Sequence, residues 1–188
     1  MKKQFHNEEV IKREQARMQK RACRPHLYGK KITVPTRNGS MHAFIYNKEN
    51  LHPGYLIVEV HGGGFMYNTA ADDDDFCHFI HQTLGIPVIA CDYSLTPEHP
   101  FPIGLEDVYD CVLHALSMKE LKAQPDRIIL WGHSAGANLT AGTVYMAREN
   151  QQFTPCMQIL DYPYMDPYRS SAERRPIRNS VSGNLMDT

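Results

Sequence analysis

Short apolar runs alternate with helical stretches along most of this chain. The apolar runs predict strands over residues 55–60, 86–91, 127–131 and 156–161, of which the first is apolar enough to be a buried central strand. Between them, the spacing of apolar residues predicts helices over residues 72–84, 103–118 and 134–148. Strands that alternate with helices of this length imply right-handed crossovers and a mostly parallel sheet.

Two of these helices have an apolar face that the spacing identifies. In the first helix we expect this face to consist of Phe76, Phe79, Ile80, Thr83 and Leu84. In the second helix it consists of Leu105, Val108, Val112 and Leu116, and Pro102 stands near the start of that helix. Each face predicts a helix that packs against the sheet.

A hairpin precedes the alternating part of the chain. Residues 31–34 and 41–46 read as strands around a turn at residues 37–40. The pair Asn38-Gly39 is a strong hairpin signal, because both residue types tolerate positive φ. The hairpin predicts an antiparallel edge on the otherwise parallel sheet.

The two ends differ from the middle of the chain. Residues 1–24 are polar and basic, and we expect a solvated helix that lies over the body of the protein. After Pro163 the chain becomes rich in proline and arginine, with few large apolar residues. We therefore expect an N-terminal helical cap segment over 1–27, an α/β core over 28–166, and over 167–188 the poorly ordered start of a cap or linker segment.

Composition narrows the class of protein. A chain of 188 residues with 42% hydrophobic residues and a net charge of -1 fits one domain and has no overall charge for nucleic acid or a membrane surface. No apolar run is long enough to span a bilayer, and the N-terminus lacks a secretory signal. The five cysteines are scattered with no Cys-x-x-Cys pair, which favours reduced thiols in a cytoplasmic protein.

The segment Gly132-His-Ser-Ala-Gly136 fits the nucleophile-elbow pattern Gly-x-Ser-x-Gly. In that pattern the nucleophile stands on a sharp turn between a strand and a helix, packed so closely that only glycine fits two residues to either side. An apolar strand precedes the pentapeptide and a helix of small residues follows it, which is the context that the motif requires. We therefore predict that Ser134 is a catalytic nucleophile, supported structurally by Gly132 and Gly136.

The second motif is His61-Gly-Gly-Gly-Phe65, directly after the expected central strand. Successive glycines let backbone N–H groups approach a ligand without side chains in the way, and such donors stabilise the oxyanion of a tetrahedral intermediate. The amide that follows the nucleophile completes the hole in this arrangement. We predict oxyanion donors at Gly62, Gly63 and Ala135, with Gly64 and His61 supporting the loop.

A third, proline-rich segment, Asp92 to Pro102, follows the strand that ends at Cys91 and reads as a rigid loop that braces the site. Together the three segments resemble the hormone-sensitive-lipase-like branch of the α/β-hydrolases over residues 28–188. The resemblance implies a three-layer sandwich, hydrolysis of short-chain carboxylic esters as small-molecule substrates, no metal or organic cofactor, and an N-terminal segment that caps the site. Two positions depart from the family: His133 stands where Asp is usual, and Ser94 where Arg is usual.

A larger departure concerns the catalytic base. In this fold the triad runs Ser, then Asp or Glu, then His. The ten histidines stand at 6, 26, 42, 52, 61, 78, 81, 99, 114 and 133, so none follows Ser134. Family members continue through two further strands, and Asp161 and Asp166 come too early to match the family's acid. We expect a C-terminally incomplete hydrolase that is weakly active or inactive, and whose incomplete sheet favours self-association.

Local histidines offer two substitutes for the base. His133 adjoins Ser134, but its side chain should leave the elbow in another direction. His61 is the better candidate, although a role in supporting its loop by hydrogen bonding is favoured. The run Asp72-Asp-Asp-Asp75 could suggest a cation site, but we interpret it as a helix N-terminus, where carboxylates meet the positive end of the dipole.

Three functional hypotheses therefore stand. The first is a truncated or interrupted serine esterase of this branch. The second is a non-catalytic module that keeps the pocket and binds a small molecule. The third is an inactive remnant, or a half that pairs with another chain.

Overall fold

The computed structural model describes residues 16, 27–48 and 50–165. The helix expected over 1–24 and the segment expected over 167–188 fall outside these residues, apart from residue 16. The hairpin and the alternating strands and helices are described in full.

Six strands form one sheet in the order β1-β2-β4-β3-β5-β6. Their bounds are β1 Lys30–Thr36, β2 Gly39–Tyr46, β3 Leu56–Val60, β4 Val88–Asp92, β5 Ile128–His133 and β6 Met157–Asp161. The hairpin strands β1 and β2 are antiparallel, and β2 also joins β4 in antiparallel fashion. The strands β3, β4, β5 and β6 run parallel. The expected parallel sheet with an antiparallel N-terminal edge is confirmed.

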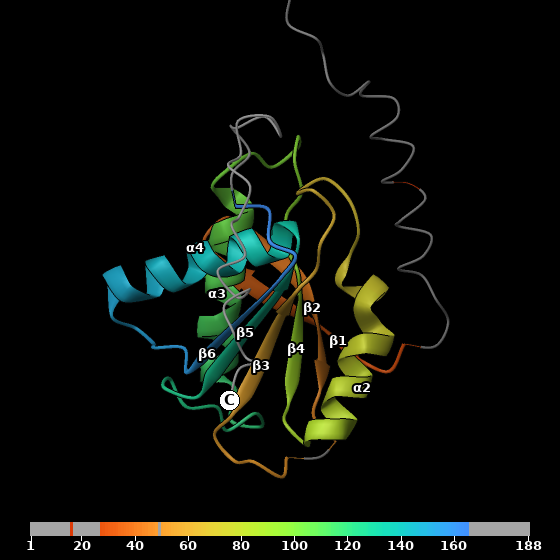
Figure 1. Ribbon diagram of the computed structural model, residues 1–188, viewed down its shortest axis with the longest axis vertical. Helices are drawn as coiled ribbons and strands as arrows, with labels where there is room; N and C mark the ends of the chain where they lie inside the picture. Colours follow the sequence, from red (N-terminus) through yellow and green to blue (C-terminus); the bar gives the residue numbers. More distant parts are fainter. Residues whose placement is uncertain (1–15, 17–26, 49, 166–188) are drawn as a thin grey trace, which may run out of the picture.

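Helices cover both faces of the sheet (Figure 1). On one face lie a short 3-10 turn, η1 (Ala70–Asp73), and helix α2 (Asp74–Leu84). On the other face lie α3 (Ile103–Ser117) and α4 (Ala135–Asn150). The result is the three-layer α/β/α sandwich that the family resemblance implies.

The core divides along the alternation of side chains in each strand. In β3, Leu56 and Val58 pack toward α3 and α4, whereas Ile57 packs toward α2. All five residues of β3 are buried, which confirms the expected central strand. Since β4 and β5 flank it, the carboxyl ends of three parallel strands meet at one edge of the sheet.

Helix α2 buries only part of the face that the sequence predicts, namely Ile80 and, in part, Phe76. Cys77, Ile80 and His81 are buried, whereas Phe79 is 66% exposed and Leu84 is 42% exposed. The reason lies in Asp74, which accepts hydrogen bonds from the amides of Tyr28 and Gly29 and from the Tyr46 hydroxyl. These bonds fix the rotation of the helix and turn Phe79 outward.

The acidic run begins this helical region, as expected from the dipole argument. Asp72 accepts a hydrogen bond from the amide of Thr69 at 3.0 Å, so it forms part of a capping box at the start of η1. Asp74 and Asp75 occupy the first turn of α2. Asp72 therefore caps η1, whereas the Asp74 carboxylate, although in the first turn of α2, bonds to Tyr28, Gly29 and Tyr46.

The hairpin turn consists of Arg37 and Asn38, and Gly39 adopts a φ of 132°. The side chain of Arg37 donates hydrogen bonds to Asp110 of α3, and Asn38 donates one to Glu106. The hairpin is thereby tied to the helix that covers its strands.

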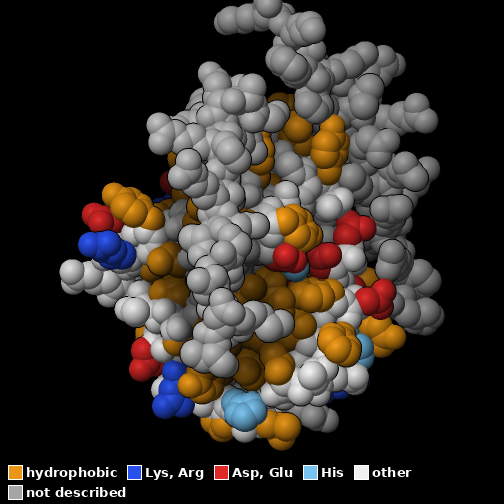
Figure 2. Space-filling model, in the orientation of Figure 1, with side chains coloured by type: hydrophobic (Ala, Val, Ile, Leu, Met, Phe, Trp, Pro, Cys, Tyr) orange, Lys and Arg blue, Asp and Glu red, His pale blue; other side chains and the backbone are white. Residues whose placement is uncertain are grey.

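Strand β6 presents apolar side chains to solvent. Met157 is 52% exposed, and beyond the strand Tyr162 is 66% exposed and Met165 51% exposed. Hydrophobic side chains also gather on the face of the molecule that Figure 2 shows. None of the helices in the described ranges combines the length and apolar character needed to cross a bilayer.

Candidate active site

Ser134 stands on a sharp turn between β5 and α4, with φ 50° and ψ -111°. This backbone conformation is unusual for a residue with a side chain and stores strain. The amide of Ser134 donates to the carbonyl of Asp161 in β6 at 2.9 Å, and its carbonyl accepts from the amide of Asn138 at 3.3 Å. The turn is therefore held between the last strand and the first turn of the helix.

The glycines of the pentapeptide allow the close packing that this turn requires. A Cβ at Gly136 would lie 2.0 Å from the carbonyl oxygen of Val60, and one at Gly132 would lie 2.4 Å from the carbonyl oxygen of Gly136. Helix α4 therefore begins in direct backbone contact with β3 and β5. At both positions a side chain would therefore collide with main-chain atoms, which is why the pattern Gly-x-Ser-x-Gly requires glycine there.

The triple-glycine loop lies against this turn. A Cβ at Gly62 would be 3.1 Å from the carbonyl oxygen of His133 and 3.4 Å from the Cβ of Ser134. Gly63 has a φ of 129°, and its carbonyl accepts from the amides of Met66 and Tyr67. The structure thus brings Gly62 and Ser134 together from segments more than 70 residues apart.

His61 lies beneath this loop and is fully buried. Its ring stacks on Tyr93 with centroids 4.2 Å apart, and its Nδ1 lies 2.7 Å from the carbonyl oxygen of Gly62. The Tyr93 hydroxyl donates to the carbonyl of His61 at 3.0 Å. Burial lowers the pKa of His61, which favours a neutral ring. Within the described residues no hydrogen bond joins it to Ser134, and its Nε2 has no partner there.

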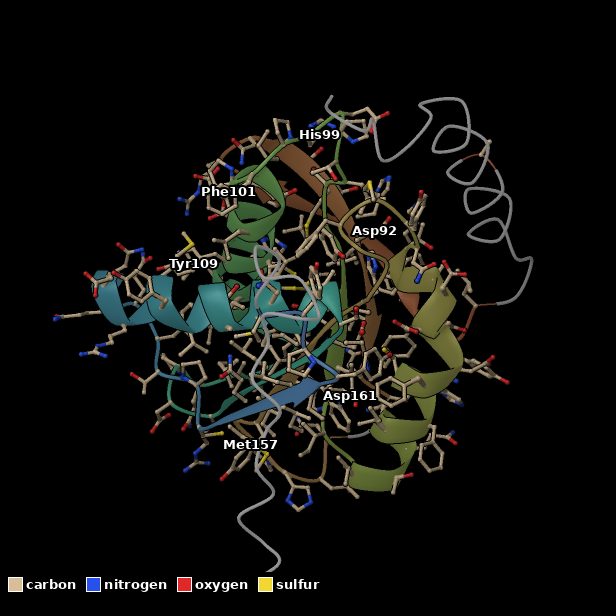
Figure 3. The ribbon with its side chains drawn as sticks, turned by 45° about the horizontal axis from the view of Figure 1, so that its top comes forward. Asp92, His99, Phe101, Tyr109, Met157 and Asp161 are labelled. Carbon is tan, nitrogen blue, oxygen red and sulfur yellow. The ribbon has the colours of Figure 1, made fainter. Side chains whose placement is uncertain are left out.

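His133 turns toward the α2 side of the sheet. Its Nδ1 lies 3.0 Å from Oδ2 of Asp161, and its ring meets Phe76 edge-on. Because successive side chains of a strand point to opposite faces, the ring of His133 lies on the face of the sheet that α2 covers. Figure 3 shows Asp161 at the end of β6 and Met157 at its start.

A buried carboxyl group beside His133 was not predicted from the sequence. Glu59 of β3 is fully buried, and its Oε1 lies 3.9 Å from Nε2 of His133 without a hydrogen-bond partner in the described part of the chain. The thiol of Cys77 lies 3.8 Å from its Oε2. Burial, with the neighbouring Asp73, raises the pKa of Glu59 well above its usual range. The available signal was that Glu59 is the single charged residue in an apolar run.

The proline-rich loop after β4 braces the triple-glycine loop. Thr96 donates its amide and its hydroxyl to the carbonyl of Phe65, at 2.9 Å and 3.1 Å. Ser94, at the position where the family has Arg, donates its amide to Asp107 of α3. His99 is exposed at the tip of the proline-rich loop (Figure 3).

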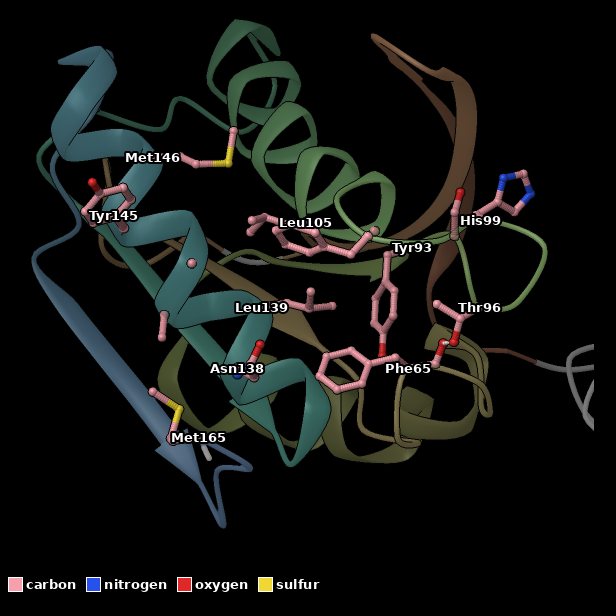
Figure 4. Close-up of a pocket in the computed structure, with 15 residues that line it drawn as sticks. Phe65, Tyr93, Thr96, His99, Leu105, Asn138, Leu139, Tyr145, Met146 and Met165 are labelled. Carbon is pink, nitrogen blue, oxygen red and sulfur yellow. Dashed lines mark hydrogen bonds between the residues drawn. The ribbon is translucent and has the colours of Figure 1, made fainter. Parts of the chain in front are cut away.

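A cavity of about 620 Å³ opens beside the elbow, between the proline-rich loop, the start of α3 and one face of α4 (Figure 4). Its walls are mainly apolar and include Phe65, Phe101, Leu105, Leu139, Tyr145 and Met146. Asn138, one helical turn beyond Ser134, also lines it.

Comparison with known proteins identifies relatives of this arrangement. A family model described as the alpha/beta hydrolase fold matches residues 57–187. The carboxylic ester hydrolase LipN of Mycobacterium tuberculosis is 33% identical over 141 residues, which cover 72% of this chain and 38% of LipN. Mouse hormone-sensitive lipase is 40% identical over 85 residues, or 45% of this chain and 11% of the lipase.

A solved esterase structure also resembles this chain. A hyperthermophilic esterase from the archaeon Pyrobaculum calidifontis superposes with a TM-score of 0.68 at 32% identity, over 82% of this chain and 51% of the esterase. The chain therefore spans about half the length of that enzyme, and less of the two curated relatives above.

Proposed function

Because this chain belongs to the α/β-hydrolase fold family, within which it resembles the hormone-sensitive-lipase branch, we propose that it carries the nucleophile of a serine carboxylic-ester hydrolase. Ser134 is that nucleophile, and a small-molecule ester is the substrate. The observation that carries this proposal is the close approach of Gly62 to the strained turn. A Cβ added at Gly62 would lie 3.4 Å from the Cβ of Ser134. That approach supports an oxyanion site directly beside the hydroxyl.

The proposed reaction begins when Oγ of Ser134 attacks the ester carbonyl carbon and loses its proton to a base. The carbonyl oxygen becomes an oxyanion, for which the amides of Gly62, Gly63 and Ala135 are the proposed donors. The C–O bond to the alcohol then breaks, and the alcohol leaves with a proton while the acyl group stays on Ser134. Water attacks this acyl-serine, releases the carboxylic acid and restores the hydroxyl.

The described residues do not supply the base that would accept the proton of Ser134. His133 interacts with Asp161, and His61 is buried beside Gly62 and Tyr93. A serine hydroxyl is a weak nucleophile without an adjacent base. We therefore expect the chain to have trace hydrolysis at most, on the order of a thousand- to ten-thousand-fold above water, which oxyanion stabilisation and binding alone provide in a protease that lacks its triad.

Covalent labelling with added imidazole tests this proposal, because imidazole supplies an external base. We expect a fluorophosphonate probe to modify Ser134 slowly, and faster as imidazole is added, with the modified residue identified by peptide mass spectrometry. Ser134→Ala should abolish the modification, and the control Ser117→Ala should retain it, since Ser117 bonds the carbonyl of His114 in α3. Modification elsewhere, or none with imidazole present, would contradict the assignment of Ser134.

A second candidate function is ligand binding without turnover. It is favoured by the same engaged histidines together with the 620 Å³ cavity. It predicts that small esters raise the melting temperature while neither hydrolysis nor imidazole-dependent labelling occurs. Rapid turnover that depends on Ser134 would exclude it.

A further inference from the structure

The carbonyl oxygen of Gly62 accepts hydrogen bonds from two side chains. Nδ1 of His61 lies 2.7 Å from this oxygen, and Nδ2 of Asn68 donates to the same oxygen at 3.3 Å. Because a carbonyl oxygen can only accept, both nitrogens present a hydrogen to it. Donors from two positions in the chain therefore hold one carbonyl group.

Holding this carbonyl fixes the direction of the amide that follows it. The peptide between Gly62 and Gly63 is trans and planar, so its C=O and N–H groups point in opposite directions. One hydrogen bond would let this peptide tilt, whereas two donors restrict its plane. Among residues 27–48 and 50–165, no backbone carbonyl accepts from the amide of Gly63. That N–H group is therefore directed away from His61 and Asn68, and no main-chain bond in the described ranges engages it.

Asn68 reaches Gly62 because the loop folds back on itself. The carbonyl of Gly63 accepts from the amides of Met66 and Tyr67 at 3.1 Å and 2.9 Å, which closes a turn. A Cβ added at Gly63 would lie 3.3 Å from the Cβ of Asn68. The side chain of Asn68 therefore starts directly beside the peptide whose carbonyl it contacts.

The backbone at Asn68 is left-handed, with a φ of 69°. Glycine adopts this conformation without strain, and asparagine tolerates it better than most other residues do. If the backbone shape were the only requirement, glycine would meet it best. Asparagine adds to that shape a side-chain amide that donates to Gly62.

We propose that Asn68 is a positioning residue of the oxyanion site. Its amide restrains the Gly62 carbonyl, and through the peptide between Gly62 and Gly63 it directs the Gly63 N–H toward the oxyanion that forms at Ser134. This role requires no contact between Asn68 and the substrate. The inference rests on the proposed function of Ser134.

The kinetics of fluorophosphonate labelling at a fixed imidazole concentration test this role. The dependence of the rate on probe concentration separates KI, which reports probe binding, from kinact, which reports the chemical step. Asn68→Gly keeps the left-handed backbone and removes the amide. We expect kinact to fall about five-fold, as for the loss of one ordinary hydrogen bond, while KI stays unchanged. The effect belongs to kinact because negative charge grows on the phosphonyl oxygen mainly in the transition state.

Two further variants separate positioning from a purely structural role. Asn68→Asp keeps the shape of the side chain, but its carboxylate cannot donate, so kinact should fall at least as far as in Asn68→Gly. Lys122→Gly is the matched control, because it makes the same replacement at an exposed left-handed position with a φ of 52°. It should leave both constants unchanged. The urea unfolding midpoint of each variant verifies that it is folded.

The hydrogen bond can also be observed without any reaction. In NMR spectra of isotopically labelled protein, the loss of a donor should move the signal of the Gly62 carbonyl carbon to lower frequency in Asn68→Gly. Lys122→Gly should leave that signal in place.

An unchanged kinact in both Asn68 variants, a change in KI alone, or a Gly62 carbonyl signal that does not move would overturn the proposal. Absence of labelling at Ser134 in the wild type, with the Gly62 signal still displaced in Asn68→Gly, would refute the catalytic assignment of Ser134. The role of Asn68 would fail with that assignment, although its bond to Gly62 exists. The two kinds of failure are therefore distinguishable.

Discussion

At the scale of single residues, Ser134, the proposed nucleophile, has an unfavourable backbone conformation. Its φ of 50° and ψ of -111° are tolerated because the Asp161 carbonyl and the first turn of α4 hold the peptide in place. Such strain costs on the order of 1–3 kcal/mol and is maintained by the surrounding structure. The strain is therefore measurable separately from any activity.

We predict that Ser134→Gly is more stable than Ser134→Ala by about 1 kcal/mol, because glycine relieves more strain than it costs in unfolded-chain entropy. Urea denaturation of both variants gives this difference. Ser117 in the last turn of α3 is the control, and there the order should reverse, with the alanine variant above the glycine variant. Equal stabilities of Ser134→Ala and Ser134→Gly would show that the turn is not strained.

Glu59 is a second residue whose environment has a measurable effect. In the folded state burial and Asp73 raise its pKa, and the Cys77 thiol and the His133 ring lie 3.8 Å and 3.9 Å from its carboxyl oxygens. As the pH rises through the usual range of a glutamate, the unfolded chain therefore releases a proton that the folded protein retains. Folding stability then falls with increasing pH until the folded pKa is reached.

We predict that Glu59→Gln removes this loss, so that the variant gains stability relative to the wild type between acidic and neutral pH, by at most about 1.4 kcal/mol per pH unit. Urea denaturation across a pH series measures it. The exposed Glu120→Gln should run parallel to the wild type. Parallel curves for Glu59→Gln as well would argue against a raised pKa at Glu59.

At the scale of elements, the contact between α4 and β3 determines how closely the two loops approach each other. The Gly136 backbone meets the carbonyl of Val60, so any side chain there must displace main-chain atoms. At Gly142, on the same helix, a Cβ would meet only the end of the flexible Leu105 side chain, at 2.8 Å. The two glycines look alike in sequence and differ in what surrounds them.

We predict that Gly136→Ala destabilises the protein by about 3 kcal/mol, because the Cβ cannot be accommodated without separating α4 from β3. Gly142→Ala should stay within about 1 kcal/mol of the wild type, since improved helix propensity offsets the shift of Leu105. Thermal unfolding compares the two variants. Equal effects would mean that α4 does not contact β3 through Gly136.

The elements were largely predictable from the sequence, because each has a periodicity that its burial enforces. Residues 56–60 and the α3 residues Val108 and Val112 are buried as predicted. The face of α2 was predicted only in part: Phe79 and Leu84 are exposed, and the bond between Asp74 and the distant Tyr46 helps to set the rotation of the helix. Local periodicity contains no information about such a contact.

The candidate site was predictable only in its backbone features. The sequence motifs that contain Ser134 and Gly62 constrain main-chain packing, so their local patterns are strong. The interactions of His133 with Asp161 and Glu59 involve three separate strands. They depend on strand order, which motif spacing does not specify.

At the scale of the whole molecule, the two edges of the sheet differ in their protection. The β1 edge contains Lys30, Lys31 and Pro35, residue types that discourage further strand pairing. The β6 edge has the sequence Met157-Gln-Ile-Leu-Asp161 and pairs only with β5 among the described residues. The β6 edge, with its exposed Met157, is where we expect copies of the chain to associate.

We predict that Met157→Lys reduces self-association, because it replaces an exposed apolar side chain with a charged one at that edge. Sedimentation velocity over a concentration series measures the change. Thr33→Lys, exposed on β1, is the control and should leave association unchanged. A monomeric wild type would remove the basis for the prediction.

Because of the register between β3 and β5, reactivity at Ser134 would report whether the protein is correctly folded. Val60 is paired with Gly132, so the triple-glycine loop and the elbow leave the sheet at the same level. A slip by one residue would move the side chain of Glu59 to the opposite face and offset the two loops. The fraction of a refolded sample that a Ser134-specific reagent labels would then equal the fraction with the native register between β3 and β5.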